Sequence, residues 1–228
     1  MSPLFKRTVK PQFCLDYLAA AKKKLSWKTP VSELRFVVLD TETSGLNVTA
    51  DRMLSLALFE VVNGQILVES RRRWTICQPG ISTTPATAIH GILPSETRTG
   101  TDEKQVIEEL LPILTGAIVV GHHTRFDARM IHEAMMRHFK TRFSNRILDT
   151  ALIAMNQLTP FHQTGYANQR PPSLDEICAH FDLPVFGRHT AECDAFLTAQ
   201  VFLLLSGRIR RRLINRSPQL RDFPLRKF

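Results

Sequence analysis

The stretch VVLDTETSGL, residues 37–46, places two carboxylic acids at the end of an apolar run. Asp40 and Glu42 follow the apolar residues 36–39, which are expected to form a buried strand. Residues i and i+2 of a strand point to the same face, so the two carboxylates are predicted to converge. Burying two ionised carboxylates side by side is costly unless a cation holds them. The pair therefore predicts a cation-binding site.

Further carboxylates should then lie at the ends of neighbouring elements. The segment GHHTRFDARMIH supplies Asp127, where a short apolar strand turns into a helix. The segment GRHTAECDAF supplies Asp194 in the first turns of the last predicted helix, five residues after His189. Four carboxylates and one histidine thus stand at the ends of elements rather than in the middle of surface faces.

These segments, taken together and in order, resemble the motifs of the DEDDh (DnaQ-like) 3′→5′ exonucleases, the family of the proofreading epsilon subunit of bacterial DNA polymerase III. LDTETSGL is similar to the first motif, GHHTRFD to the second, and HTAECD, with its His-x4-Asp spacing, to the third. AIHGI (88–92) is similar to the stretch between the first two motifs. The resemblance covers about residues 34–205 and implies metal-dependent removal of nucleotides from a 3′ end.

The resemblance also implies a role for each of these groups. Phosphodiester hydrolysis is assisted by two divalent ions roughly 3.5–4 Å apart, which activate water and stabilise the departing oxygen. Hard cations such as Mg²⁺ or Mn²⁺ prefer carboxylate oxygens. His189 is the predicted general base, a role worth roughly 10²–10⁴-fold in rate. The predicted catalytic residues are Asp40, Glu42, Asp127, His189 and Asp194, of which the four acids hold the two ions, with Asp40 bridging them.

Contacts to the 3′-terminal nucleotide are suggested by the same resemblance. The backbone of residues 43–45 is expected to approach the terminal sugar, and Leu46 to pack under the last base. His90 is expected to meet the terminal nucleotide or its phosphate, while Phe126 lines the same pocket or belongs to the core. The predicted substrate-binding residues are Thr43, Ser44, Gly45, Leu46, His90 and Phe126.

Three features depart from the motifs or compete with them. His123 stands where the family usually has Asn, and the expected role there is structural hydrogen bonding. Asp149 lies at a strand-to-helix junction, where N-capping is a better explanation than metal binding. QLTPF (157–161) resembles peptides that bind sliding clamps but is interpreted as ordinary loop. The surrounding Pro- and Gln-rich segment 156–172 is expected to be a long loop that can overhang the substrate cleft.

The elements that position these residues follow from apolar periodicity. Asn63-Gly64, between two alternating runs, is a strong hairpin signal, so three antiparallel strands should open the domain. Helices and parallel strands then alternate, which predicts an α/β fold, a mixed sheet flanked by helices; the resemblance makes it ribonuclease H-like. Strands are expected over 34–41, 53–62, 65–77, 117–121 and 146–150, and helices over 12–25, 102–114, 127–139, 173–182 and 190–206, with one more beginning near Ala151.

The net charge of +9 is concentrated in the two ends of the chain. Residues 1–33 hold seven Lys and Arg against two acids, and residues 206–228 hold eight against one. The middle is slightly acidic. This pattern predicts a basic N-terminal extension with a short helix (1–33), an exonuclease domain (34–206) and an Arg-rich C-terminal tail (207–228). The ends are interpreted either as contacts for a polyanion or as solvated tails.

The sequence shows no apolar run near the ~18–20 residues that span a bilayer, so no membrane association is expected. The N-terminus has no continuous apolar segment of a secretory signal. Four cysteines without CxxC pairing favour a reducing cytoplasm over a disulfide framework or a zinc site.

The function predicted first is a metal-dependent exonuclease that releases nucleoside monophosphates from single-stranded 3′ ends, with DNA preferred. An exoribonuclease resembling oligoribonuclease or ribonuclease T is the nearest alternative. A catalytically silent nucleic-acid-binding module is a more remote one, and an accessory subunit docked on a DNA polymerase subunit is another.

Overall fold

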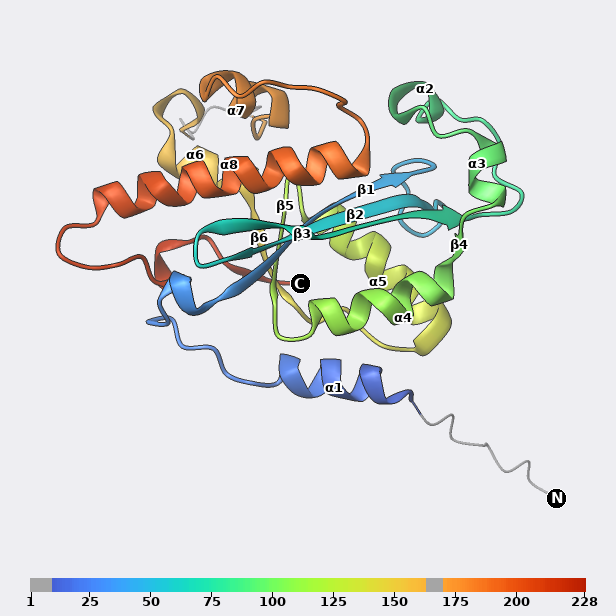
Figure 1. The fold of residues 1–228 in the computed structure, drawn as a ribbon, viewed down its shortest axis with the longest axis horizontal. Helices are drawn as coiled ribbons and strands as arrows, with labels where there is room; N and C mark the ends of the chain where they lie inside the picture. Colours follow the sequence, from blue (N-terminus) through green and yellow to red (C-terminus); the bar gives the residue numbers. More distant parts are fainter. Residues whose placement is uncertain (1–9, 163–169) are drawn as a thin grey trace.

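A seven-stranded mixed sheet runs through the centre of the computed structural model, which describes residues 10–162 and 170–228 (Figure 1). The strand order is β4-β3-β2-β1-β5-β6-β7. The first three strands pair antiparallel, and β5 and β6 then add parallel to β1, as predicted. The strands are β1 (Arg35–Thr43), β2 (Met53–Val62), β3 (Gln65–Cys77), β4 (Thr101–Asp102), β5 (Ile118–Gly121), β6 (Arg146–Asp149) and β7 (Arg226–Lys227).

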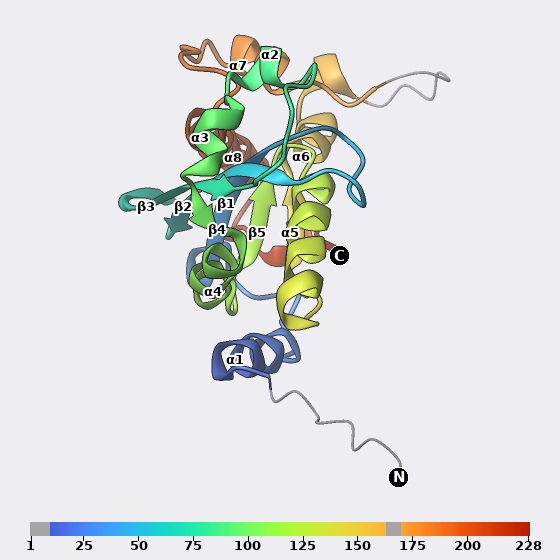
Figure 2. The same ribbon diagram turned by 90° about the vertical axis from the view of Figure 1, so that its right-hand side faces the viewer.

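Helices cover both faces of this sheet (Figures 1 and 2). On one face α8 packs on β1 and β2, and α6 and α7 pack against α8. On the other face α4 and α5 cover the sheet, and α1 packs against α4. The helices are α1 (Gln12–Ala21), α2 (Thr87–His90), α3 (Pro94–Arg98), α4 (Glu103–Leu114), α5 (Arg125–Phe139), α6 (Thr150–Gln157), α7 (Leu174–His180) and α8 (Ala191–Arg212), with short 3₁₀ turns at Val31–Glu33, Thr159–Phe161 and Leu220–Asp222.

Successive side chains of β1 point to opposite faces of the sheet. Phe36 and Val38 belong to the apolar core under α8, whereas Val37 and Leu39 belong to the core under α4 and α5. Side chains two residues apart share a face, so Asp40 continues the row that points toward α8. The strand is buried on both faces, which explains its nearly continuous apolar sequence.

The predicted helices and strands are confirmed, with shifts at their ends. The hairpin strands 53–62 and 65–77 have the predicted bounds. The last helix is longer than predicted, since α8 runs to Arg212 instead of ending at 206. The short helices α2 and α3 were not among the predicted elements. Part of the loop predicted over 156–172 lies outside the described residues.

The segment 207–228 was predicted to be an Arg-rich tail, but part of it packs into the core. Leu220 and Phe223 are buried in the core under α8. Gln219 of this segment forms an isolated antiparallel β-bridge with Pro30. Further along, the segment adds β7 to the sheet, antiparallel to β6. Its apolar residues follow neither a helical nor a strand period, so only tertiary packing reveals that they belong to the core.

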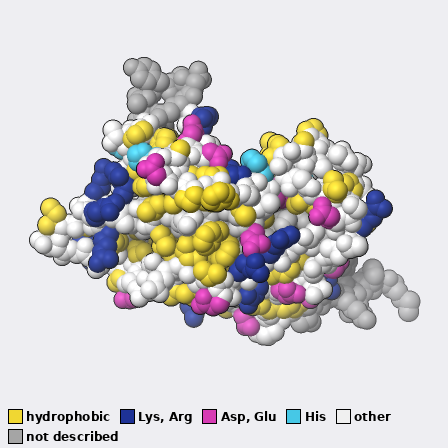
Figure 3. Space-filling view, turned by 45° about the horizontal axis from the view of Figure 1, so that its top comes forward, with side chains coloured by type: hydrophobic (Ala, Val, Ile, Leu, Met, Phe, Trp, Pro, Cys, Tyr) yellow, Lys and Arg dark blue, Asp and Glu magenta, His cyan; other side chains and the backbone are white. Residues whose placement is uncertain are grey.

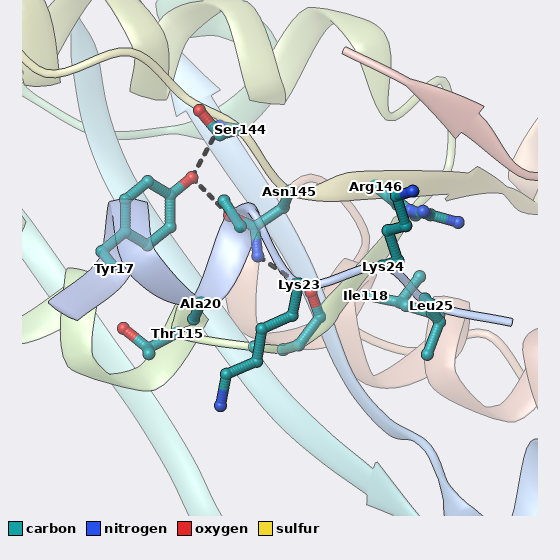
Figure 4. Close-up of a pocket in the computed structure, with 13 residues that line it drawn as sticks. Tyr17, Ala20, Lys23, Lys24, Leu25, Thr115, Ile118, Ser144, Asn145 and Arg146 are labelled. Carbon is teal, nitrogen blue, oxygen red and sulfur yellow. Dashed lines mark hydrogen bonds between the residues drawn. The ribbon is translucent and has the colours of Figure 1, made fainter.

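The N-terminal helix α1 is joined to the domain by a buried polar network (Figure 4). Tyr17 Oη donates to Asn145 Oδ1 (2.6 Å) and accepts from Ser144 N (2.7 Å). Asn145 Nδ2 in turn donates to the carbonyls of Leu114 and Ala117. Burial raises the pKa of Tyr17 to about 12, so the hydroxyl stays a donor. The described part of the N-terminal segment, from residue 10, and the C-terminal segment therefore both pack on the central domain.

Within the described ranges, no helix is both long and apolar enough to cross a bilayer.

Leu220→Ala should lower the free energy of unfolding by about 2–4 kcal/mol, because it empties a fully buried position. Ile214→Ala is the matched control, since that side chain is 84% exposed and should change stability by less than about 0.5 kcal/mol. Urea unfolding followed by circular dichroism measures both. Equal stability of the two variants would show that the C-terminal segment is not part of the core.

Candidate active site

Three carboxylates meet at the end of β1. Asp40 and Glu42 extend from the strand, and Asp194 comes from the first turn of α8. One oxygen from each lies within 4.8 Å of the other two. Asp194 Oδ1 is buried and has no hydrogen-bond partner among the described residues. The cluster forms because residues 40 and 42 of β1 both point to the face of the sheet that α8 covers.

Asp127 approaches the same strand end from α5. Its side chain is only 4% exposed, and its Oδ1 accepts hydrogen bonds from Thr41 N (3.1 Å) and Thr41 Oγ1 (2.6 Å). Thr41 points to the face opposite Asp40, so one strand holds acids on both of its faces. The structure thus brings all four predicted carboxylates to one end of the sheet.

Burial and mutual repulsion raise the pKa values of these acids. Burial, followed by the charges of Asp127, Asp194 and Glu42, raises the pKa of Asp40 well above its ordinary value. Burial and the Asp194 charge raise the pKa of Glu42 to about 7. Burial also raises the pKa of Asp127 to about 7, although its hydrogen bonds from Thr41 oppose the shift. The ionised cluster needs a cation.

Arg188 supplies one positive charge, which the sequence analysis missed. Its guanidinium forms an ion pair with Asp194 and contacts Asp175 Oδ1 at 2.7 Å. Burial lowers the pKa of Arg188, but the contacts with Asp175 and Asp194 outweigh it and raise the pKa. The only sequence signal was a basic residue directly before His189, and most arginines in such loops are solvated.

His189 lies in the loop that leads into α8. Its φ of 63° is left-handed, and its backbone N–H donates to Asp194 Oδ2 (3.2 Å). The imidazole is exposed beside the cluster and makes no hydrogen bond to any residue the structure describes. The ring is therefore free to act on a molecule bound in front of the carboxylates.

The loop after β1 is shaped by Asp51, which the sequence did not single out. Asp51 Oδ1 accepts from Ser44 Oγ (2.7 Å), and Asp51 Oδ2 accepts from Asn47 N (2.8 Å). A Cβ on Gly45 would lie 2.5 Å from Asp51 Oδ2, so only glycine fits there without displacing that carboxylate. The side chains of Thr43 and Ser44 are mostly buried. Ser44 N donates to Arg52 O (3.0 Å), and Ser44 O accepts from Thr84 Oγ1 (3.0 Å), so this turn is fixed by the surrounding loops.

The other predicted contact residues lie around this loop. His90 is buried, and its Nδ1 accepts from Ile92 N (3.0 Å). Burial lowers the pKa of His90, and its contact with the backbone of Thr43 opposes that effect. Leu46 is 85% exposed at the mouth of the site. Phe126 packs on the core and also lines a surface groove with Leu46, so both predicted roles are compatible.

The Asn-to-His departure at position 123 has a backbone explanation. His123 has a φ of 58°, in the left-handed region where Asn and His are enriched among non-glycine residues. Its N–H donates to Asp149 Oδ1 (3.2 Å). Asp149 also accepts from Ala151 N (3.0 Å), which confirms the predicted N-cap of α6.

The donor set suits hard divalent cations, because every candidate ligand atom is a carboxylate oxygen. Asp194 Oδ1 is buried without a hydrogen-bond partner among the described residues, and the pKa values of Asp40 and Glu42 are raised. Both features are expected of a metal-binding cluster in the absence of its ions. The residues present therefore fit divalent metal ions. Bound there, the ions would lie beside the exposed imidazole of His189.

Comparison with protein families matches residues 37–202 to the family RNase_T, described as Exonuclease. Among curated proteins, the chain is 30% identical over 194 residues to the DNA polymerase III subunit epsilon-like protein of Rhodobacter capsulatus. It is 28% identical over 201 residues to the PolC-type DNA polymerase III of Thermotoga petrophila. These matches cover 83% and 86% of this chain but only 26% and 14% of those relatives, so the chain spans about a quarter of their length or less.

Among solved structures, E. coli exonuclease I in complex with a dT13 oligonucleotide matches with a TM-score of 0.66 and 21% identity. The match covers 78% of this chain and 42% of that one. Its complex with a dA16 oligonucleotide gives a TM-score of 0.65 at 20% identity, over 78% of this chain and 42% of that one. This likeness confirms the predicted ribonuclease H-like fold.

The metal-free protein should lose stability as the pH rises from about 4.5 to about 7. The folded-state pKa of Glu42, about 7, lies above its ordinary value of 4.5, so the folded state binds more protons than the unfolded chain in this range. The contribution is fully present below pH 4.5 and is lost as the pH passes 7. Glu42→Gln should remove on the order of 1–3 kcal/mol of this loss.

Thermal unfolding in chelator at pH 5 and pH 8 checks this expectation. Glu69→Gln, which changes an exposed carboxylate on β3, is the matched control. The pH dependence is not due to the cluster if the two variants lose the same stability between the two pH values.

Arg188→Gln should lower the stability of the metal-free protein by about 3 kcal/mol, because Asp194 loses its buried counter-charge. Mn²⁺ should then raise the Tm of the variant more than that of the wild type. Asp175→Asn, which removes the exposed partner and keeps the cation, should have a smaller effect. A Tm deficit that is the same with and without Mn²⁺ would mean that Arg188 only packs.

Proposed function

The chain belongs to the RNase_T exonuclease family, and from this premise we propose that it is a metal-dependent 3′→5′ exonuclease acting on single-stranded DNA. In this proposal it hydrolyses the terminal phosphodiester bond and releases nucleoside monophosphates. The convergence of Asp40, Glu42 and Asp194, with Asp127 behind β1, is the observation that carries the proposal. Four acids from three separate elements repel one another, and bound divalent cations would offset that repulsion.

In this proposal the acids of the site bind metal ions and His189 transfers a proton. Asp40, Glu42 and Asp194 would hold a divalent cation, and Asp127 would complete the second position. Two such ions, Mg²⁺ or Mn²⁺, would activate the attacking water and stabilise the departing 3′ oxygen. His189 would accept the proton of that water, and the absence of a hydrogen bond from its imidazole to any described residue supports this role.

The surroundings of the cluster suit a terminal nucleotide. In this proposal the backbone of Thr43, Ser44 and Gly45 approaches the terminal sugar, and His90 contacts the terminal nucleotide or its phosphate. Leu46 offers an exposed apolar surface for the last base. Stacking and apolar contact of this kind bind single strands with little sequence preference.

DNA is preferred over RNA because the structural neighbour was solved with a dT13 oligonucleotide and the similar proteins are DNA polymerase III components. Exoribonuclease activity is the alternative, and the 2′-hydroxyl distinguishes the two.

The names of the relatives also favour a DNA polymerase subunit as partner and, with it, a cytoplasmic location. The four free cysteines accord with a reducing compartment.

Cleavage of 5′-labelled single strands in Mg²⁺ should give a ladder that shortens from the 3′ end. Asp40→Asn should reduce cleavage to background, and His189→Ala should slow it roughly 10²–10⁴-fold. Asp182→Asn is the matched control, because Asp182 is exposed and its φ of 53° suits Asn equally well. Matched DNA and RNA oligonucleotides measure the sugar preference.

Full activity of Asp40→Asn would disprove the site assignment. Binding of oligonucleotides without cleavage in either Mg²⁺ or Mn²⁺ would instead support the silent binding module.

A further inference from the structure

A surface groove of about 460 Å³ lies between the loop after β1 and the first turns of α5. Two of its lining residues, Leu46 and Phe126, are next in sequence to Gly45 and Asp127 of the candidate site. Its walls combine apolar and cationic side chains. The lining residues are Leu46, Asn47, Val48, His123, Arg125, Phe126 and Arg129.

Two arginines on α5 give the groove its charge. Arg125 and Arg129 are exposed and lie one helical turn apart on the same side of α5. Neither forms an ion pair with a carboxylate in the described part of the chain. Like charges four residues apart destabilise a helix slightly, so the pair has no structural benefit of its own.

The floor of the groove is apolar. Leu46 is exposed over 85% of its surface, and Val48 and Phe126 are half-buried beside it. An apolar floor beside paired guanidinium groups matches a nucleotide, which offers a flat base and a phosphate.

The positive charge continues beyond the groove. Arg125 also lines a smaller pocket with Arg226 and Lys227 of β7, which the fold brings to the same edge. By contrast, Figure 3 shows basic side chains gathered over the distant end of α8, where Arg208, Arg211 and Arg212 line a separate pocket.

We propose that the groove holds the nucleotide that precedes the 3′-terminal one, with its phosphate on Arg125 and Arg129 and its base against Val48 and Phe126. The strand then continues toward Arg226 and Lys227. This proposal rests on the proposed function and makes it more specific. It assigns the binding of the preceding nucleotide to α5 and leaves the terminal nucleotide to residues 43–46 and His90.

Two substrates separate this groove from the catalytic cluster. Thymidine 5′-(4-nitrophenyl) phosphate has a terminal nucleotide and a scissile ester but no second nucleotide. A 5′-labelled oligo(dT) has both. The variants are Arg125→Gln, Arg129→Gln and the double variant. Arg142→Gln is the matched control, because Arg142 is exposed and follows the opposite end of α5, roughly 20 Å away.

The double variant should lower kcat/KM for oligo(dT) about 10- to 100-fold, mainly through KM, and should lower it far less for the nitrophenyl ester. Binding of oligo(dT) by the Asp40→Asn protein, followed by fluorescence anisotropy, adds a readout that needs no turnover. The slope of log K against log salt should fall by about 0.7 for each arginine removed. Arg142→Gln should leave both readouts unchanged.

Equal losses on the two substrates, or an unchanged salt slope in the double variant, would overturn the groove assignment. If the wild type cleaves neither substrate, the proposed function fails, and the salt slope still decides whether the groove binds a strand. Binding of an acidic peptide with the same salt slope and stronger affinity would assign the groove to a protein partner and overturn the proposal.

Discussion

The repulsion among four carboxylates at one end of a sheet is the constraint on which the rest of this structure depends. Asp127 and Asp194 both lie in the first turn of a helix, where the positive end of the helix dipole lowers the cost of their charge. Arg188 adds one full positive charge. These compensations leave the pKa values of Asp40 and Glu42 raised, so the protein keeps a site that a divalent cation stabilises.

Strand β1 makes this arrangement possible because both of its faces are used. The face toward α8 presents Asp40 and Glu42 to Asp194, and the opposite face presents Thr41 to Asp127. Apolar layers on both sides keep the strand from shifting, and a shift of one residue would exchange the two faces. The hydrophobic core therefore holds the register that the site requires.

The fold also places the basic side chains of the C-terminal region on separate parts of the surface. The C-terminal segment turns back, buries Leu220 and Phe223, and places Arg226 and Lys227 near the start of α5. The arginines at the end of α8 stay on a different part of the surface. The basic residues that form two clusters in the sequence are thus distributed by packing over separate parts of the surface.

The sequence by itself determined the local features of this protein. The hairpin at Asn63-Gly64, the apolar strand before Asp40 and the N-cap at Asp149 depend on near neighbours, so their residue types and spacing were sufficient. The motif order also predicted that four acids meet at one site, and the structure brings their carboxylates to one end of the sheet. Only the tertiary structure decided the position of Arg188 in the cluster, the organising role of Asp51 and the burial of the C-terminal segment. These depend on contacts between segments distant in the chain, and no periodicity records which distant surface a lone arginine, aspartate or leucine will meet.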